Sequence, residues 1–405
     1  MLRITYRPLS RCQVAAEECS TTTQARVEAA RAVPNRLSKK RTVLSMRIMS
    51  LSTDYFRLPL PPSEDGGHGA IDTEELVFVN VHTDLADGFG YAYTIGKGGR
   101  AIRSLIDHEI ADAVIGLDFA SPEDAWRHVW RRMLYIGRGG LTSFAIAALD
   151  MALWDAYAKA DGVPLYRAIG AQSKELPTYG SGVDLQKSTE DLLEQIDGYK
   201  ARGLRGVKMK VGRPTLSEDI ERVAAVRDHL GTAVDLMVDA NMAWDRDEAL
   251  EAARQLEPFE LRWLEEPLTP EDIEGHAHLR RETSTPLSVG ESFHSPAEFH
   301  AYARAGGSDV FQVDPVTNGG VTVAIEALRA ANAAGIDASS HYADELNAHI
   351  LCLAERPVFL EKHAFALDAY LEDPQEIVDG FVRPSERPGH GIAFLAEAVE
   401  PFRAD

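Results

Sequence analysis

The sequence predicts an α/β protein built around a (β/α)8-type TIM barrel, with an α+β capping domain. Two observations predict the barrel. Short apolar runs alternate with helical patterns, and each run ends in a polar residue at a regular interval. This interval is 26 residues from Asp239 to Glu265 and again to Glu291, and 27 residues from Asp314 to His341. Such alternation indicates parallel βα units, whose chemistry in a barrel lies at the C-terminal ends of the strands.

Composition and charge exclude several classes of function. The chain of 405 residues is 45% hydrophobic, which is ordinary for a globular protein. Its net charge of -21 argues against nucleic acid or an anionic membrane as the partner. No apolar run approaches the roughly 20 residues of a membrane span. Because Cys12, Cys19 and Cys352 are too scattered for a disulfide or zinc framework, we expect a cytoplasmic protein.

The charge is unevenly spread along the chain. Residues 1–45 hold nine Lys or Arg against three Glu, and their polar composition resembles a transit peptide. An unstructured or mis-started extension is the favoured interpretation, because Met46 opens a run typical of a first strand. The predicted organisation is therefore an extension over 1–45, a cap over 46–170, a barrel over 171–364, and a tail over 365–405 that returns to the cap.

The cap is expected to combine a small sheet with helices. Residues 76–82 and 88–93 predict two strands around an Asp87-Gly88 turn. The Pro- and Gly-rich segment 58–70 predicts a loop, either a lid over the site or a simple surface loop. Helical patterns cover 101–113, 122–134 and 142–159, and small residues in the last indicate close packing on a neighbour. The first barrel strand is expected near Leu176.

A pair of lysines marks the strand over 206–210. Lys208 and Lys210 lie two residues apart, so their side chains share one face of the strand. A solvent-exposed pair is the weaker interpretation, because barrel strands are covered on both faces. Two ammonium groups held close together should lower the pKa of each, and a lysine that is neutral near pH 7 can act as a base.

Three carboxylates follow on successive strands. Asp239, Glu265 and Glu291 form an all-oxygen set, which favours a hard cation, Mg²⁺ before Mn²⁺. Asp314 and His341 come from the next two strands. A carboxylate beside an imidazole orients the ring and raises its basicity, so His341 is a candidate acid or base.

With these motifs in order, the sequence resembles the enolase superfamily, in the mandelate racemase subgroup of the mandelate racemase/muconate lactonizing enzyme family. The matching residues are the Lys208-Met-Lys210 motif, the triad, the dyad and Glu361. The resemblance implies an enolase-like barrel with one Mg²⁺ per subunit, and a homo-oligomer. It also implies α-proton abstraction from a carboxylic acid, with Lys210 and His341 on opposite faces of the substrate. Lys208 would be the electrostatic partner of the carboxylate, and Glu361 would donate a hydrogen bond to it.

The same residues serve several reactions. Segments 90–99, 135–140 and 180–185 resemble sugar-acid members of the subgroup, such as 3,6-anhydro-L-galactonate cycloisomerases and talarate/galactarate dehydratases. The residues over 313–318 and 340–345 depart from those expected in cycloisomerases. We therefore expect a Mg²⁺-dependent sugar-acid dehydratase, with the cycloisomerase second. A hydroxy-acid racemase or epimerase stays open, and so does a catalytically silent barrel that binds Mg²⁺ or a sugar acid.

Further polar residues at or beyond the strand ends are candidates for contact with substrate hydroxyls. For Glu345 a capping or surface role is the favoured interpretation. The predicted contacts are Asn241, His294 and Asn318 in the barrel, and Tyr93 and Arg138 in the cap.

Overall fold

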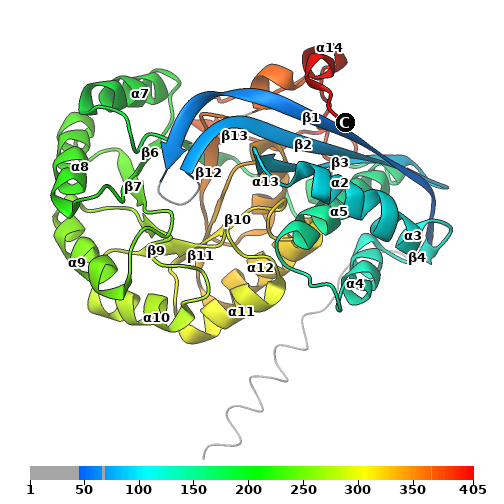
Figure 1. The fold of residues 1–405 in the computed structure, drawn as a ribbon, viewed down its shortest axis with the longest axis horizontal. Helices are drawn as coiled ribbons and strands as arrows, with labels where there is room; N and C mark the ends of the chain where they lie inside the picture. The colour runs from blue at the N-terminus through cyan, green and yellow to red at the C-terminus, as the bar shows by residue number, and fades with distance from the viewer. Residues whose placement is uncertain (1–44, 66–68, 366) are drawn as a thin grey trace, which may run out of the picture. The chain divides into compact units, whose positions relative to one another are not determined.

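The computed structural model describes residues 45–65, 69–365 and 367–405. The predicted extension over 1–45 lies outside these residues except for Ser45. Within the described residues, no helix is long and apolar enough to cross a membrane. The predicted fold class is confirmed, because a closed barrel of parallel strands stands beside an antiparallel capping sheet (Figure 1).

The cap sheet has the strand order β3-β2-β1-β4. Its strands are β1 (Met46–Asp65), β2 (Gly69–Thr83), β3 (Asp87–Ile95) and β4 (Asp118–Phe119). The expectation of a loop over 58–70 was wrong for the described part: β1 continues to Asp65 with a register irregularity between Pro59 and Ser63, and β2 begins at Gly69. Residues 66–68 of that predicted loop lie outside the described residues. Prolines fit there because β4 pairs only with Met46 and Arg47, which leaves this part of β1 as an edge strand.

The turn between β2 and β3 also differs from the prediction. Asp87 and Gly88 belong to β3, and the chain reverses over residues 84–86. There the Thr83 hydroxyl accepts a hydrogen bond from Ala86 N at 3.1 Å and donates to Ala86 O at 2.6 Å. A side chain that bonds the backbone in this way stabilises the turn without a glycine.

Helices cover the cap sheet on one face. They are α2 (Gly99–Leu105), the π-helical η1 (Ile106–Ile110), α3 (Ala111–Val114), α4 (Pro122–Arg132), α5 (Leu141–Ala160) and α6 (Leu165–Ala168). As predicted, α5 packs closely through its small residues, here against β3. A Cβ on Gly88 would lie 1.9 Å from Ala152 O, and one on Gly90 would lie 2.2 Å from Ala148 O. Only glycine permits this approach.

The barrel strands run in sequence order and are closed by parallel pairing of the last strand with the first. They are β5 (Leu176–Ser181), β6 (Gly206–Lys210), β7 (Asp235–Asp239), β8 (Leu264–Glu265), β9 (Leu287–Val289), β10 (Val310–Val313), β11 (Asp337–Ser340) and β12 (Pro357–His363). The connecting helices form the outer ring in Figure 1. They are α7 (Thr189–Ala201), α8 (Leu216–Leu230), α9 (Arg246–Leu256), the 3-10 helix η2 (Glu257–Phe259), α10 (Ile273–Glu282), α11 (Pro296–Ala305), α12 (Val321–Ala334), α13 (Asp344–Ile350) and the 3-10 helix η3 (Leu351–Leu353).

The register of the barrel brings the polar strand ends together. Lys210 pairs with Asp239, and Asp239 pairs with Glu265. Val313 pairs with Ser340, so Asp314 and His341 follow at the same level. Because all strands are parallel, their C-terminal ends meet at one end of the barrel.

Residues 367–405 pair with the first barrel strand, β5, and also contact the cap. They contain η4 (Leu367–Tyr370), β13 (Phe381–Val382), α14 (Ala396–Val399) and η5 (Glu400–Phe402). Ala404 N donates to Tyr55 O at 2.9 Å. The buried Asp155 carboxylate of α5 accepts from His390 N at 3.1 Å and from Phe89 N at 2.9 Å. One acid thus joins the cap helix, the cap sheet and the tail.

Candidate active site

A cavity of about 490 Å³ lies between the cap and the C-terminal ends of the barrel strands. Tyr93 of the cap lines it, together with Lys210, Asn241, Glu291 and His341 of the barrel. This volume is in the range of small-molecule sites.

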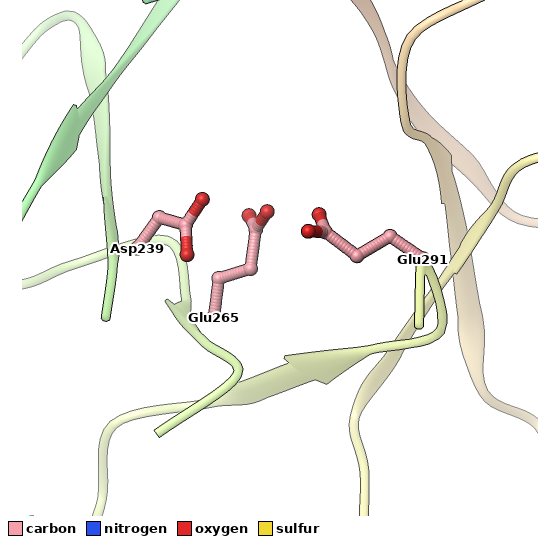
Figure 2. Close-up of side chains that lie close together, drawn as sticks. All are labelled: Asp239, Glu265 and Glu291. Atoms are coloured by element: carbon pink, nitrogen blue, oxygen red, sulfur yellow. The ribbon is translucent and has the colours of Figure 1, made fainter. Parts of the chain in front are cut away.

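The three predicted metal ligands lie at the strand ends and point toward one another (Figure 2). One oxygen from each of Asp239, Glu265 and Glu291 lies within 4.8 Å of the others, and all three side chains are buried. Glu291 Oε2 is buried without a hydrogen-bond partner in the described part of the chain. The nearest cation to this oxygen is His341 Nε2 at 3.5 Å, too far for a hydrogen bond by geometry, so a lone pair stays available and the all-oxygen set fits Mg²⁺.

Both lysines of the β6 motif point into this carboxylate cluster. Lys208 Nζ lies 2.5 Å from Glu265 Oε1 and 3.2 Å from Glu361 Oε1, and Lys210 Nζ lies 2.7 Å from Asp239 Oδ2. The expected lowering of the lysine pKa values was wrong for this arrangement. Burial lowers the pKa of Lys210 and so does Lys208, but the carboxylates outweigh both effects and raise it. The lysines act here as counter-ions of the carboxylates.

The predicted dyad is formed, and the cap joins it. His341 Nδ1 lies 2.8 Å from Asp314 Oδ2, and Tyr93 Oη donates to the same oxygen at 2.5 Å. Burial alone would lower the pKa of His341, but Glu291 and Asp314 raise it to about 10. Because Nδ1 is occupied by Asp314, Nε2 is the ring nitrogen left for a ligand.

Glu361 is a carboxylate in this arrangement. Its Oε2 accepts a hydrogen bond from Tyr342 N at 2.7 Å. Burial would raise the pKa of Glu361, but the nearby Lys208 and His341 hold it well below its usual range. The predicted hydrogen bond from Glu361 to a substrate carboxylate stays a prediction.

Two of the remaining predicted contacts line the cavity. Asn241 is there, with its backbone N donating to Asp239 Oδ1 at 3.0 Å. His294 is also there, with its Nδ1 3.1 Å from Ser143 Oγ of α5. Both side chains are less tightly hydrogen-bonded than the Asp314–His341 pair, so both are positioned to contact a ligand.

The other predicted contacts have structural roles. Asn318 is fully buried, and its amide donates to Gly290 O at 2.8 Å and Phe293 O at 2.7 Å, so it joins the ends of neighbouring strands. The Arg138 guanidinium lies 4.6 Å from the centre of the Trp130 ring, and Arg138 is not among the residues that line the cavity. A polar residue near a strand end does not reach the substrate when the backbone takes all of its hydrogen bonds.

Several residues of the site were not predicted from the sequence. Asp184 accepts from Lys210 N at 2.8 Å and fixes the end of β6; its position after a Gly-rich strand end could have suggested it. Glu74, Tyr342 and His363 line the cavity, but nothing in the spacing of the sequence marks them. Glu345 is buried in α13 and does not line the cavity.

Comparison with known proteins identifies the family. The family model described as mandelate racemase / muconate lactonizing enzyme, N-terminal domain, matches residues 62–170. The model described as enolase C-terminal domain-like matches residues 191–398. The chain is 40% identical to the 3,6-anhydro-alpha-L-galactonate cycloisomerase of Streptomyces coelicolor over 354 residues, which cover 87% of this chain and 98% of that protein.

Two solved structures resemble the fold. A racemase from Streptomyces coelicolor with bound magnesium has a TM-score of 0.85 and 38% identity, covering 88% of this chain and 100% of that one. The L-talarate dehydratase from Polaromonas sp. JS666, complexed with Mg and L-glucarate, has a TM-score of 0.82 and 34% identity, covering 89% and 98%. This chain therefore belongs to the mandelate racemase / muconate lactonizing enzyme family of the enolase superfamily.

Proposed function

We propose that this protein is a Mg²⁺-dependent acid-sugar dehydratase, which removes the proton α to a sugar-acid carboxylate and expels the β-hydroxyl. The observation that carries the proposal is that Lys210, His341 and the triad ligand Glu291 line one cavity. A base, an acid and a cation site therefore meet around one ligand.

The chain's own residues supply the proton transfers. The C–H bond at the α-carbon breaks and its proton goes to Lys210 Nζ, with the electron pair passing to the carboxylate as an enediolate. The electrons then return to form a carbon–carbon double bond while the β C–O bond breaks. His341 Nε2 gives the leaving oxygen a proton, so that water departs, and the enol becomes a 2-keto-3-deoxy acid. Asp314 holds His341 in the tautomer this step needs.

Asp239, Glu265 and Glu291 would hold the cation. When bound, Mg²⁺ would supply the positive charge that stabilises the enediolate and would replace the two ammonium groups as counter-charge of the triad. Lys210, no longer paired with Asp239, can then accept a proton, and Lys208 can stabilise the substrate carboxylate. We further propose one Mg²⁺ per subunit, replaceable by Mn²⁺, and a cytoplasmic homo-oligomer.

A second candidate is the cycloisomerase reaction. The specific observation in its favour is the 40% identity with the Streptomyces coelicolor cycloisomerase over almost the whole of that protein. The same residues would serve, because expulsion of a ring ether oxygen from the β-carbon needs the same base and the same acid. Only the source of the leaving oxygen differs.

The test is a screen of the full-length protein with Mg²⁺ in deuterated water, followed by proton NMR. The library contains aldonic, aldaric and uronic acids and 3,6-anhydro-L-galactonate. A 2-keto-3-deoxy product from an open-chain acid supports the dehydratase, and ring opening of the anhydro acid alone supports the cycloisomerase. Deuterium uptake without loss of oxygen would instead indicate a racemase or epimerase.

Matched variants distinguish catalysis from binding. Lys210→Ala should abolish turnover, whereas Lys200→Ala, which removes a lysine from the surface of α7, should leave it unchanged. An absence of turnover and exchange with every acid, despite measured Mg²⁺ binding, would contradict the enzyme and favour a silent barrel.

A further inference from the structure

Glu74 is a buried carboxyl group in the wall of the cavity that the proposed chemistry does not use. It lies on β2 of the cap, is 3% exposed and lines the same cavity as Lys210 and His341. On β2 it pairs with Leu58 of β1 and with Ile95 of β3, so its backbone is held on both sides. The cap thus presents an acid to the ligand.

The hydrogen bonds around Glu74 define its protonation state. Tyr342 Oη lies 2.6 Å from Phe365 O and 2.8 Å from Glu74 Oε1. A carbonyl oxygen only accepts, so the single phenolic proton of Tyr342 is used toward Phe365 O. Because this proton cannot serve both acceptors, we infer that Glu74 is a carboxylic acid whose own proton is donated to Tyr342 Oη.

The electrostatic surroundings favour the same state. Burial raises the pKa of Glu74 to about 8, and even a hydrogen bond donated by Tyr342 would offset only part of this effect. The titratable groups influenced by Glu74 are Tyr91, Tyr342 and Tyr370, and Glu345 acts on Tyr342 as well. These groups are neutral tyrosines and one further acid. Lys97, Lys210, His341 and His363 line the same cavity, but they do not contribute to the pKa of Glu74, which burial and Tyr342 alone shift.

Tyr342 is held firmly enough to orient Glu74. Its φ of 44° is left-handed, a conformation that costs a residue with a side chain about 1–3 kcal/mol and persists only where the surroundings enforce it. Its backbone N donates to Glu361 Oε2 at 2.7 Å, and its ring centre lies 4.5 Å from that of Tyr93. The contact between Tyr342 and Glu74 therefore belongs to a rigid group of side chains that also includes Tyr93 and Glu361.

We propose that Glu74 is a specificity-determining residue that binds a hydroxyl group of the sugar acid, acting as an uncharged carboxylic acid whose carbonyl oxygen accepts the hydroxyl proton. The proposal rests on the proposed function. With its acid proton donated to Tyr342, Glu74 presents a pure acceptor to the cavity. A neutral group does not repel an anionic substrate, whereas a carboxylate would.

The experiment compares Glu74→Gln and Glu74→Leu in the full-length, Mg²⁺-loaded protein. Gln keeps the geometry, because its amide N–H can donate to Tyr342 Oη and its carbonyl can face the cavity. Leu removes both. The probes are the six-carbon acid turned over in the screen and its 4-deoxy, 5-deoxy and 6-deoxy analogues. Glu75→Gln is the matched control, since Glu75 is the next buried acid on β2 but points to the other face and accepts from Gly99 N.

Glu74→Gln should keep kcat/KM within about threefold of the wild type, whereas Glu74→Leu should lose about tenfold or more, the value of one hydrogen bond. For one of the deoxy analogues, wild type and Glu74→Leu should be equal, which identifies the hydroxyl bound. The proposal is overturned if Gln is as damaging as Leu, which would indicate a required carboxylate. It is also overturned if Leu lowers kcat/KM equally for every analogue, which would indicate a structural role. Failure of the proposed function would differ, because the wild type itself would then show no turnover.

Discussion

The hydroxyl of Tyr93 offers a sharp test of how the cap takes part in the chemistry. Tyr93 Oη and His341 Nδ1 both bond Asp314 Oδ2, at 2.5 and 2.8 Å. Tyr93→Phe deletes one buried hydroxyl and keeps the ring that packs on Tyr342. Asp314 then holds more negative charge at the oxygen that faces His341, so His341 should release its Nε2 proton less readily.

The magnitude follows from the bonds that remain. A hydrogen bond to a charged group is worth about 1.5–3 kcal/mol. Asp314 keeps His341 at Oδ2 and Val316 N at Oδ1, 2.8 Å away, so it is not left without partners. We expect the free energy of unfolding to fall by about 1.5 kcal/mol and β-oxygen loss to slow by about tenfold, since 1.4 kcal/mol corresponds to a factor of ten. KM and proton abstraction by Lys210 should change little.

The assay follows both steps in one sample. Proton NMR in deuterated water gives the rate of product formation and the rate of deuterium uptake into recovered substrate, and urea titration gives the stability. Tyr91→Phe is the control, because Tyr91 is also buried on β3 but its hydroxyl has no hydrogen-bond partner among the residues that the structure describes. Equal loss of exchange and elimination in Tyr93→Phe, or an equal effect of Tyr91→Phe, would refute a positioning role for this hydroxyl.

Further predictions concern the metal, the acid, the cap packing and pH. Glu265→Gln should abolish Mg²⁺-dependent turnover, a loss of about 10³-fold or more, with the fold retained by circular dichroism; full turnover would reject it as a ligand. His341→Asn should slow elimination by about 10²–10⁴-fold and leave α-proton exchange on a substrate of suitable configuration, and loss of both would argue against separate roles. Gly90→Ala should cost about 1–3 kcal/mol of stability, because its Cβ would lie 2.2 Å from a backbone oxygen of α5, whereas Gly198→Ala, with open space around it, should be neutral or stabilising in thermal unfolding. Glu74 is uncharged below its pKa of about 8, so the kcat/KM of the wild type should fall as pH rises through that value and Glu74→Gln should lack this limb; identical profiles would contradict its protonated state.

The barrel was predictable because the lengths of a strand, a helix and two loops determine the repeat length of a βα unit. One strand, one helix and two loops take about 26 residues here, and parallel strands bring their ends to one mouth, so Asp239, Glu265 and Glu291 were identifiable from spacing. The dyad followed for the same reason. The pKa of Lys210 was not predictable, because the balance between a neighbouring ammonium group and a carboxylate depends on distances of 3 to 4 Å that no spacing determines.

The structure of the cap was harder to predict from the sequence. The proline-rich composition after Leu58 indicated a loop, but an edge strand tolerates proline and β1 continues. Nothing in the alternation of β2 shows that Glu74 faces the barrel, because this depends on how the cap docks. Asn318 was misassigned because an amide at a strand end can be used entirely by the backbone.

The contact between the tail and β1 has a consequence for the order of synthesis. Ala404 N bonds Tyr55 O, and Arg403 forms a bridge with Phe56, so the edge of β1 is completed by residues that are synthesised after every barrel strand. All eight barrel strands precede those residues, so the barrel can fold while the seam between β1 and the tail is still open. Closure of that seam should follow the folding of the barrel, and the edge of β1 around Tyr55 would stay open to other strands until then, although β2 already pairs with its other edge.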